Sequence, residues 1–282
     1  MNYSHTLPIK QHAFPCALLQ PYIDRYWSWE GDTSQIPTLP RMLPGAGKEL
    51  VLHYEIPFAI ERLTGCREQL PQAHMICLRT QTASLSPGTK TGFISIRFKT
   101  GAFGHFCDLP AKSITDSFID APLIFGDSIR ILNHKIIEAK TFHERVALIE
   151  PYMLALLHVG SKHQAFLYDA VQALYYGHAF IRPKDVSQHL GVGERQLQRI
   201  FKEEMGVGPK QFIRLSRFQN TAKDLLLARP NDTLKVALEH GYYDQSHFIR
   251  DFKHFVGETP LAFLNSQDSM THFYNTSRHK NA

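Results

Sequence analysis

The chain has 282 residues, 43% of them hydrophobic and 20% charged, which is typical of a globular protein with one large domain or two of ordinary size. Its apolar runs fall short of the roughly 20 residues that a membrane span needs, and its N-terminus lacks the charged and then apolar layout of a signal peptide. We therefore expect a cytoplasmic protein with no membrane partner. The net charge is +5, and residues 161–282 hold 16 Lys and Arg against 12 Asp and Glu, which favours a polyanionic partner for that part.

The cysteines and histidines give little sign of metal or redox chemistry. Cys16, Cys66, Cys77 and Cys107 are scattered over the first half without a CxxC pair. We expect buried free thiols, with a redox or metal role as the alternative. The 16 histidines include no HxxxH or HExxH spacing, so no zinc site is predicted. We accordingly expect no cofactor, no metal and no catalytic residue.

The first part of the chain alternates short β-like runs with turn residues, and helical patterns follow. Strands are predicted over 49–55, 74–79 and 92–99. In the last of these, Phe93 and Ile94 are expected on opposite faces of the pleat. Helices are predicted over 113–118, 126–138 and 141–158. Residues 1–160 are therefore expected to form an α+β domain of mixed strands followed by helices.

A polar, glycine-containing stretch at 157–163 is the predicted domain boundary, and everything after it is predicted to be helical. The predicted helices cover residues 165–178, 183–190, 194–205, 209–227, 234–239, 244–255 and 260–264. The helix over 209–227 would span about 28 Å at 1.5 Å per residue. Residues 161–268 are thus expected to form an all-α domain, and residues 269–282 a flexible tail.

One pattern occurs twice in this all-α part, 51 positions apart. The first copy reads Leu197-x-Arg199-x-Phe201-Lys202-x-x-x-Gly206-x-x-Pro209-x-x-Phe212. The second reads Phe248-x-Arg250-x-Phe252-Lys253-x-x-x-Gly257-x-x-Pro260-x-x-Phe263. Repetition at a fixed spacing indicates one supersecondary unit used twice.

The first copy belongs to a predicted helix-turn-helix. Residues 190–193 carry two glycines between two short helices, which is typical of the joint of that motif. In the helix beyond the joint, an apolar stripe opposes a polar one. The apolar stripe consists of Leu197, Ile200, Phe201 and Met205, and the polar stripe of Arg195, Gln198, Arg199 and Lys202. Arginine and glutamine can contact base edges, and Lys202 is better placed for a phosphate. Taken alone, the polar stripe could also be an ordinary solvated helix face.

The second copy has the same division. Asp244 is the expected N-cap of its recognition helix, and Phe248, Phe252 and Phe255 are expected in the core. The predicted exposed row consists of Ser246, Arg250 and Lys253, with Gln245, His247 and Ile249 beside it. Because the helix over 209–227 separates the two units, they can lie roughly one duplex turn, about 34 Å, apart on one face of DNA.

At these residues the chain resembles the AraC/XylS family of bacterial transcriptional regulators, over about residues 163–265. The most specific part is Gly241-Tyr-Tyr-Asp-Gln-Ser-His-Phe-x-Arg-x-Phe-Lys, followed by Gly257-x-x-Pro260. The resemblance implies two helix-turn-helix subdomains joined by a long helix, with both recognition helices in the major groove of double-stranded DNA. By motif position it implies base contacts from Arg195, Gln198 and Arg199 in the first unit, and from Gln245, Ser246, His247 and Arg250 in the second. The first unit departs from the family pattern at Gly193, which replaces a capping Ser, and at Ser187, which replaces Ala.

The N-terminal part loosely resembles sensor-type domains attached to some members of this family. The resemblance is carried by Arg41-x-x-Pro44-Gly-x-Gly-x-Glu49-Leu-Val-Leu-His and by the run from Gly92 to Pro110. It suggests an effector-binding or dimerisation module. Trp27, Trp29, Phe58, Phe93, Phe103 and Phe106 could line a pocket, although core packing is the favoured role. Arg41 and Arg97 could pair with an anionic effector or form structural salt bridges.

The favoured function is a DNA-binding transcriptional regulator whose N-terminal domain responds to a small-molecule effector or to self-association. RNA polymerase is a further candidate partner. The first alternative is an enzyme fused to the DNA-binding module, such as a DNA-repair methyltransferase, which would need an activated cysteine. The second is a protein-binding regulator that has lost DNA contact.

Overall fold

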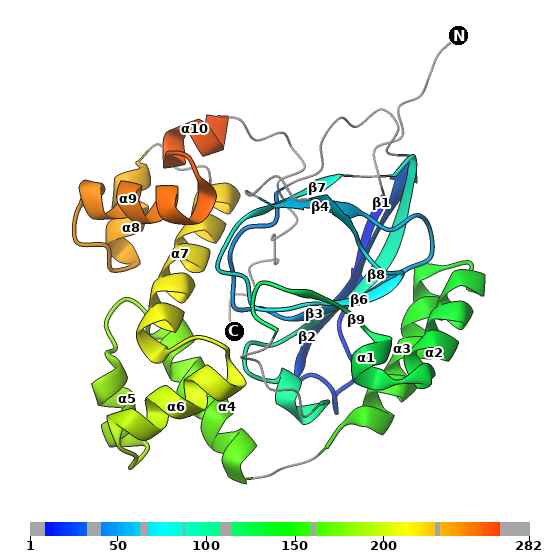
Figure 1. Ribbon diagram of the computed structural model, residues 1–282, viewed down its shortest axis with the longest axis horizontal. Helices are drawn as coiled ribbons and strands as arrows, with labels where there is room; N and C mark the ends of the chain where they lie inside the picture. The colour runs from blue at the N-terminus through cyan, green and yellow to red at the C-terminus, as the bar shows by residue number, and fades with distance from the viewer. Residues whose placement is uncertain are drawn as a thin grey trace.

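The computed structural model describes residues 9–32, 41–62, 67–86, 88–107, 114–158, 162–228 and 232–265. A strand-rich N-terminal domain is followed by a helical C-terminal domain, so the fold class predicted from the sequence is confirmed (Figure 1). In the described part of the chain, no helix is both long and apolar enough to cross a membrane. The expected tail and the centre of the expected domain boundary lie outside the described residues.

Two antiparallel sheets build the N-terminal domain. The six-stranded sheet has the order β1-β2-β8-β3-β6-β9, and the three-stranded sheet has the order β5-β4-β7. The strands are β1 (Ile9–Ala13), β2 (Ile23–Asp32), β3 (Glu49–His53), β4 (Ala59–Arg62), β5 (Arg67–Gln69), β6 (Ala73–Ile76), β7 (Ala83–Ser86), β8 (Lys90–Phe98) and β9 (Phe118–Asp120). The three predicted strands correspond to β3, β6 and β8.

Side chains alternate between two cores because both faces of the six-stranded sheet are covered. The inner face packs against the three-stranded sheet through a cluster that includes Trp27, Trp29, Val51, Phe58, Ile60, Leu85 and Phe93. The outer face packs against helices through Leu50, Leu52, Ile94, Ile96 and others. Phe93 and Ile94 therefore lie on opposite faces, as predicted. Core packing is confirmed for all six aromatic residues considered above, since Phe103 and Phe106 are buried in the outer cluster.

The helices of the N-terminal domain are α1 (Pro122–Phe125), α2 (Asp127–Glu138) and α3 (Phe142–Leu156). Thr141 begins α3 with a capping box, in which Glu144 is the reciprocal partner. The predicted helix over 113–118 is wrong. Residue 113 is outside the described part, Ile114–Asp116 form a turn, and Phe118 begins β9, which pairs with β6. Asp116 has a left-handed backbone, φ 59°, and accepts hydrogen bonds from the backbone N–H and the hydroxyl of Thr80 at 2.6 and 2.5 Å.

The C-terminal domain consists of helices at the predicted positions. They are α4 (Lys162–Tyr176), α5 (Pro183–His189), α6 (Glu194–Glu204), α7 (Pro209–Ala228), α8 (Thr233–Glu239), α9 (Gln245–Val256) and α10 (Pro260–Asn265). Helices α5 and α6 form one helix-turn-helix, and α8 and α9 form the other. Figure 1 shows α6 and α9 at opposite ends of α7. The 20 residues of α7 span about 30 Å.

The two domains touch along α4, α7 and the end of α9. Gln172 of α4 donates a hydrogen bond to the carbonyl oxygen of Thr100 at 2.7 Å. On α7, Gln219 accepts one from the backbone N–H of Ala46 at 2.9 Å. The hydroxyl of Thr82 donates to the carbonyl oxygen of Phe255 at 2.8 Å. One hydrophobic core runs across this boundary and includes Leu43 and Leu78 of the N-terminal domain.

Candidate nucleic-acid interface and interdomain pocket

The first helix-turn-helix turns at Gly191, whose φ of +67° is a conformation that glycine adopts readily. Gly193 is the N-cap of α6 in an extended conformation and supplies no side-chain hydrogen bond, as its sequence predicted. Leu197, Ile200 and Phe201 are buried, so the apolar stripe faces the core. The polar stripe of Arg195, Gln198, Arg199 and Lys202 is exposed.

The exposed side chains of α6 are not equally ready for DNA. Arg195, Arg199 and Lys202 make no ion pair with any residue that the structure describes. Gln198 instead lies against Gly208, where an added Cβ would be 2.5 Å from its Nε2 atom. Gln198 must therefore swing away from Gly208 to reach a base edge.

The second helix-turn-helix turns at Gly241, with φ of +83°. Asp244 caps α9, because its carboxylate accepts a hydrogen bond from the backbone N–H of His247 at 2.7 Å. The phenylalanines expected in the core, Phe248, Phe252 and Phe255, are buried. Among the predicted contacts, Gln245, Ser246, Arg250 and Lys253 are exposed, whereas His247 is half-buried. The ring of His247 packs beside Tyr242, and its Nδ1 atom lies 3.4 Å from the backbone N–H of Tyr243.

A buried carboxylate that the sequence reasoning missed fixes α9 on α7. Asp251 is 3% exposed. It accepts a hydrogen bond from Arg214 of α7 at 2.5 Å and another from the hydroxyl of Tyr242 at 3.2 Å. Burial raises the pKa of the Tyr242 phenol, and the charge of Asp251 raises it further, so the phenol stays a donor. The signal available in the sequence was an acidic residue at the position that Ile200 fills in the first copy.

A cavity of about 820 Å³ lies between the N-terminal domain and helices α4 and α7. Its wall includes Arg97 and Lys99 from the first domain, Tyr175 and Lys223 from the second, and apolar side chains such as Phe98. Both domains therefore contribute to one site. From the sequence, Arg97 was considered for an effector site, but no residue of the C-terminal domain was.

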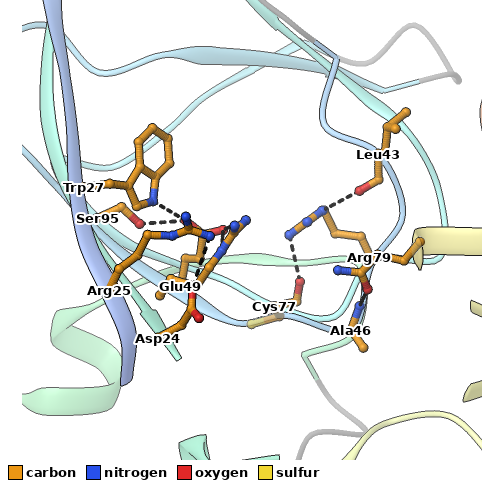
Figure 2. Close-up of polar contacts among 11 residues, drawn as sticks. Asp24, Arg25, Trp27, Leu43, Ala46, Glu49, Cys77, Arg79 and Ser95 are labelled. Carbon is orange, nitrogen blue, oxygen red and sulfur yellow. Dashed lines mark hydrogen bonds and ion pairs between the residues drawn. The ribbon is translucent and has the colours of Figure 1, made fainter. Parts of the chain in front are cut away.

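Charged residues gather on the inner face of the sheet (Figure 2), and Glu49 and Arg97 among them line the cavity. Arg97 of β8 lies directly opposite Arg25 on the neighbouring strand β2, and directly opposite Glu49 on the other neighbour, β3. Glu49 accepts hydrogen bonds from Arg97 at 2.7 and 3.0 Å, from Ser95 at 2.7 Å and from Trp27 at 3.1 Å. Burial alone would raise the Glu49 pKa, but Arg97, Ser95 and Arg79 outweigh it and the pKa is lowered. Of the two roles considered for Arg97, the structure therefore shows the structural salt bridge, with Glu49 as its partner.

Arg25 is not satisfied in the same way. Its side chain is buried, and its Nη2 atom lies 3.0 Å from Oδ2 of Asp24 without making a hydrogen bond to any described acceptor. Like charges directly opposite each other in a sheet are destabilising. Burial lowers the pKa of Arg25, and the charge of Arg97 lowers it further. Among the residues that line the cavity, the cations Arg79, Arg97, Lys99 and Lys223 outnumber the carboxylates Asp24 and Glu49.

Lys223 brings a further positive charge to this site from α7. Burial lowers the pKa of Lys223; Asp24 raises it, while Arg25 and Arg97 lower it. Cations from the two domains thus repel each other across the cavity. Arg41 is not part of this group, because it forms an interdomain ion pair with Glu258 and lies over the ring of Phe263.

The cysteine thiols take no part in either site, although the carbonyl oxygen of Cys77 accepts a hydrogen bond from the cavity-lining Arg79. Cys16, Cys77 and Cys107 are free thiols, as predicted, but only Cys77 is fully buried, and Cys66 lies outside the described residues. Burial raises the pKa of Cys77 to about 11, which disfavours the reactive thiolate. Within the described ranges, no group of three or more His, Cys, Asp and Glu side chains is placed to hold a metal ion.

Two family models match the chain. Residues 186–266 match a helix-turn-helix domain, and residues 11–120 match a domain of unknown function, DUF6597. An uncharacterized HTH-type transcriptional regulator from Staphylococcus aureus strain MSSA476 is 28% identical over 102 residues, which are 36% of this chain and 14% of that protein. The HTH-type transcriptional regulator ArgR of Pseudomonas aeruginosa is 29% identical over 92 residues, 33% of this chain and 28% of ArgR. The chain therefore matches only a minor part of the length of these relatives.

Among solved structures, ToxT from Vibrio cholerae has the same general fold. The TM-score is 0.50 at 9% sequence identity, and the likeness covers 92% of this chain and 97% of ToxT. At that identity the likeness concerns the fold alone. It extends over both domains, and so agrees with a strand-rich domain joined to two helix-turn-helix units.

Proposed function

We propose that this chain, whose residues 186–266 match a helix-turn-helix domain and resemble the AraC/XylS family, is a sequence-specific DNA-binding transcriptional regulator. The observation that carries the proposal is the pair of exposed cationic helix faces on α6 and α9. They lie at opposite ends of a helix about 30 Å long, close to the 34 Å or so of one duplex turn. The DNA-repair alternative has no support of this kind.

The proposed contacts divide by chemistry. Arg195, Gln198 and Arg199 in the first unit would contact base edges, because arginine can fork onto guanine and glutamine onto adenine. Gln245, Ser246, His247 and Arg250 would do so in the second. Lys202 and Lys253 would contact phosphates, which position the protein without reading sequence. A homodimer and contact with RNA polymerase are compatible with this arrangement.

Selection of duplexes from a random pool by the full chain tests this proposal. We expect enriched sites with two half-sites about one helical turn apart, and an affinity that falls steeply as salt is raised. A duplex that retains one half-site should bind more weakly. Enrichment of no sequence, or binding that is independent of salt, would contradict the proposal.

We further propose that the interdomain cavity binds the effector, and that the effector is a small organic anion with an apolar body. Three observations support this: Lys99 lines the cavity from the N-terminal domain, Lys223 lines it from the other domain, and aromatic side chains form part of the wall. An anion would relieve the repulsion between the domains. It would thereby favour one arrangement of the two domains, which is how a ligand alters DNA affinity.

Thermal unfolding of the full chain with matched probes tests the ligand class. We expect 1-naphthoate to raise the melting temperature and its neutral analogue 1-naphthamide to leave it unchanged. Inorganic phosphate, which lacks the apolar body, should have a smaller effect. Lys223→Gln should weaken naphthoate binding about tenfold, the equivalent of about 1.4 kcal/mol. Lys210→Gln, on the same helix but outside the cavity, is the control. Equal stabilisation by acid and amide would disprove the charge argument.

A further inference from the structure

Two histidines connect the loop that leads into the first helix-turn-helix unit with the turn of the second unit. His178 lies in the loop between α4 and α5, just before the first unit, and His240 ends α8 at the turn of the second. Their rings stack with centroids 5.3 Å apart, and Nε2 of His178 is 3.0 Å from Nδ1 of His240. Nδ1 of His178 is 2.6 Å from the carbonyl oxygen of Tyr175, and Nε2 of His240 is 3.0 Å from the carboxylate of Asp224 on α7.

The number of protons in this chain of contacts follows from its two ends. A carbonyl oxygen can only accept, so Nδ1 of His178 carries a proton; a carboxylate also accepts, so Nε2 of His240 carries one. In the buried His178 ring the second nitrogen is then the acceptor, and Nδ1 of His240 must donate to it. Three of the four ring nitrogens are protonated, whereas two neutral imidazoles would carry two protons. Next to the ionised Asp224 carboxylate, the two rings together therefore carry one positive charge.

Any other proton count breaks a contact. If His240 loses a proton, a nitrogen lone pair faces either His178 or the Asp224 carboxylate. If His178 gains one, two N–H groups face each other. Burial has the largest effect on the pKa of His178 and lowers it. His240 and Arg217 also lower this pKa, whereas the Tyr175 carbonyl and Asp224 raise it. The charged groups that act on the pair are thus Arg217 and Asp224, both on α7.

This contact lies where the two units are pressed together. An added Cβ on Gly241 would be 2.7 Å from the carbonyl oxygen of Ala179 and 2.8 Å from its Cα. The turn of the second unit therefore packs on the backbone that leads into the first. The histidine contact and this packing therefore join the two units at a place that is separate from α7.

We propose that His178 and His240 are positioning residues for two-site DNA binding, and that the shared extra proton holds the two units in register. The chain would then bind a two-half-site duplex tightly only while the pair retains that proton. This proposal rests on the proposed function for its DNA arm, but its proton count stands apart from it.

Nitrogen-15 NMR of the histidine rings in the full chain tests the proton count without DNA. At about pH 6.5, near the ordinary histidine pKa, we expect both nitrogens of His240 and only Nδ1 of His178 to be protonated. Asp224→Asn, which keeps the shape but removes the charge, should leave His240 with one protonated nitrogen. A singly protonated His240 in the unaltered chain would overturn the proposal.

The DNA arm uses the two-half-site duplex selected by the chain. Between about pH 6 and about pH 8.5, which brackets the ordinary histidine pKa, affinity should fall about tenfold, the effect of losing one charge-assisted hydrogen bond. His240→Gln and Asp224→Asn should bind weakly throughout and show no such fall, while the exposed His189→Gln should keep the original profile. If the unaltered chain, His240→Gln and Asp224→Asn all showed the same dependence of DNA affinity on pH, the positioning role would be overturned. Failure to select any duplex would overturn the proposed function and leave the NMR result to decide the proton count.

Discussion

The two helix-turn-helix units share a sequence pattern but are built with different turns. In the first, Gly191 is followed by Val192 and then by the N-cap Gly193. In the second, Gly241 is followed by Tyr242 and Tyr243 before the N-cap Asp244, so this turn is one residue longer. The additional Tyr243 is 87% exposed. The repeated pattern begins after the turn, which is why the pattern alone did not reveal the insertion.

The units also differ in what holds the recognition helix. At one position of α6 the side chain is Ile200, which packs in the core. The corresponding position of α9 is Asp251, held by Arg214 and Tyr242. Apolar contacts tolerate small rotations, whereas hydrogen bonds to a carboxylate fix a direction. The second unit is therefore held in a defined orientation on α7, and the first relies on shape alone.

The largest effect that tests this contrast should come from Asp251→Asn. It removes the charge that Arg214 and Tyr242 share, and breaking a pair of this kind costs about 2–3 kcal/mol when one partner is partly solvated. Urea unfolding of the full chain measures the loss. The matched change Ile200→Val should cost only about 1 kcal/mol. An unchanged midpoint for Asp251→Asn would mean that the polar anchor contributes nothing.

Arg250→Ala should cost about 1–3 kcal/mol of specific DNA binding and relax sequence preference at one position. Arg199→Ala should cost less, because its helix is less firmly oriented. Affinities for the selected duplex, with competitor DNA present, provide the comparison. Lys135→Ala on the N-terminal domain is the control. A larger loss for Arg199→Ala would reverse the order of the two units.

Lys202→Ala and Lys253→Ala should weaken binding to all duplexes to a similar degree. Each should lower the slope of log affinity against log salt by about 1, since one phosphate contact is lost. A salt titration with selected and random duplexes checks this. Loss confined to the selected sequence would show that these lysines contact bases instead.

The caps should give the smallest effects. Asp244→Ala removes the side-chain acceptor at the start of α9 and should cost about 1 kcal/mol of stability. Gly193→Ser adds an acceptor at the start of α6 and should gain a few tenths of a kcal/mol. Differential unfolding measurements on both variants decide whether the two caps are as unequal as the geometry indicates. A gain as large as the loss would contradict the expectation that glycine is nearly as good an N-cap as serine.

Periodicity predicted the helical half well because each helix carries its own signal. The apolar stripes on α6 and α9 and the cap at Asp244 are local features, and so was the length of α7. The roles of Asp251 and His240 were not predicted, because their partners, Arg214 and Asp224, lie on a different helix. No spacing rule links them.

The strand-rich half was predicted less completely. β2 was missed because Tyr26, Trp27, Ser28 and Trp29 are all buried, so no alternation marks the strand. The predicted helix over 113–118 failed because distant partners decide that segment: Thr80 holds Asp116, and β6 pairs with β9. The charged cavity depends on the meeting of two domains, which a single chain pattern does not contain.

Gln219 gives the contact between the halves a particular consequence. It accepts the hydrogen bond from Ala46 near the midpoint of α7, about ten residues from either end of that helix. Other contacts are less central: Thr82 donates a hydrogen bond to the carbonyl oxygen of Phe255 at the end of α9, and Arg41 pairs with Glu258 just beyond it. A displacement of the N-terminal domain should therefore act on the second helix-turn-helix more directly than on the first.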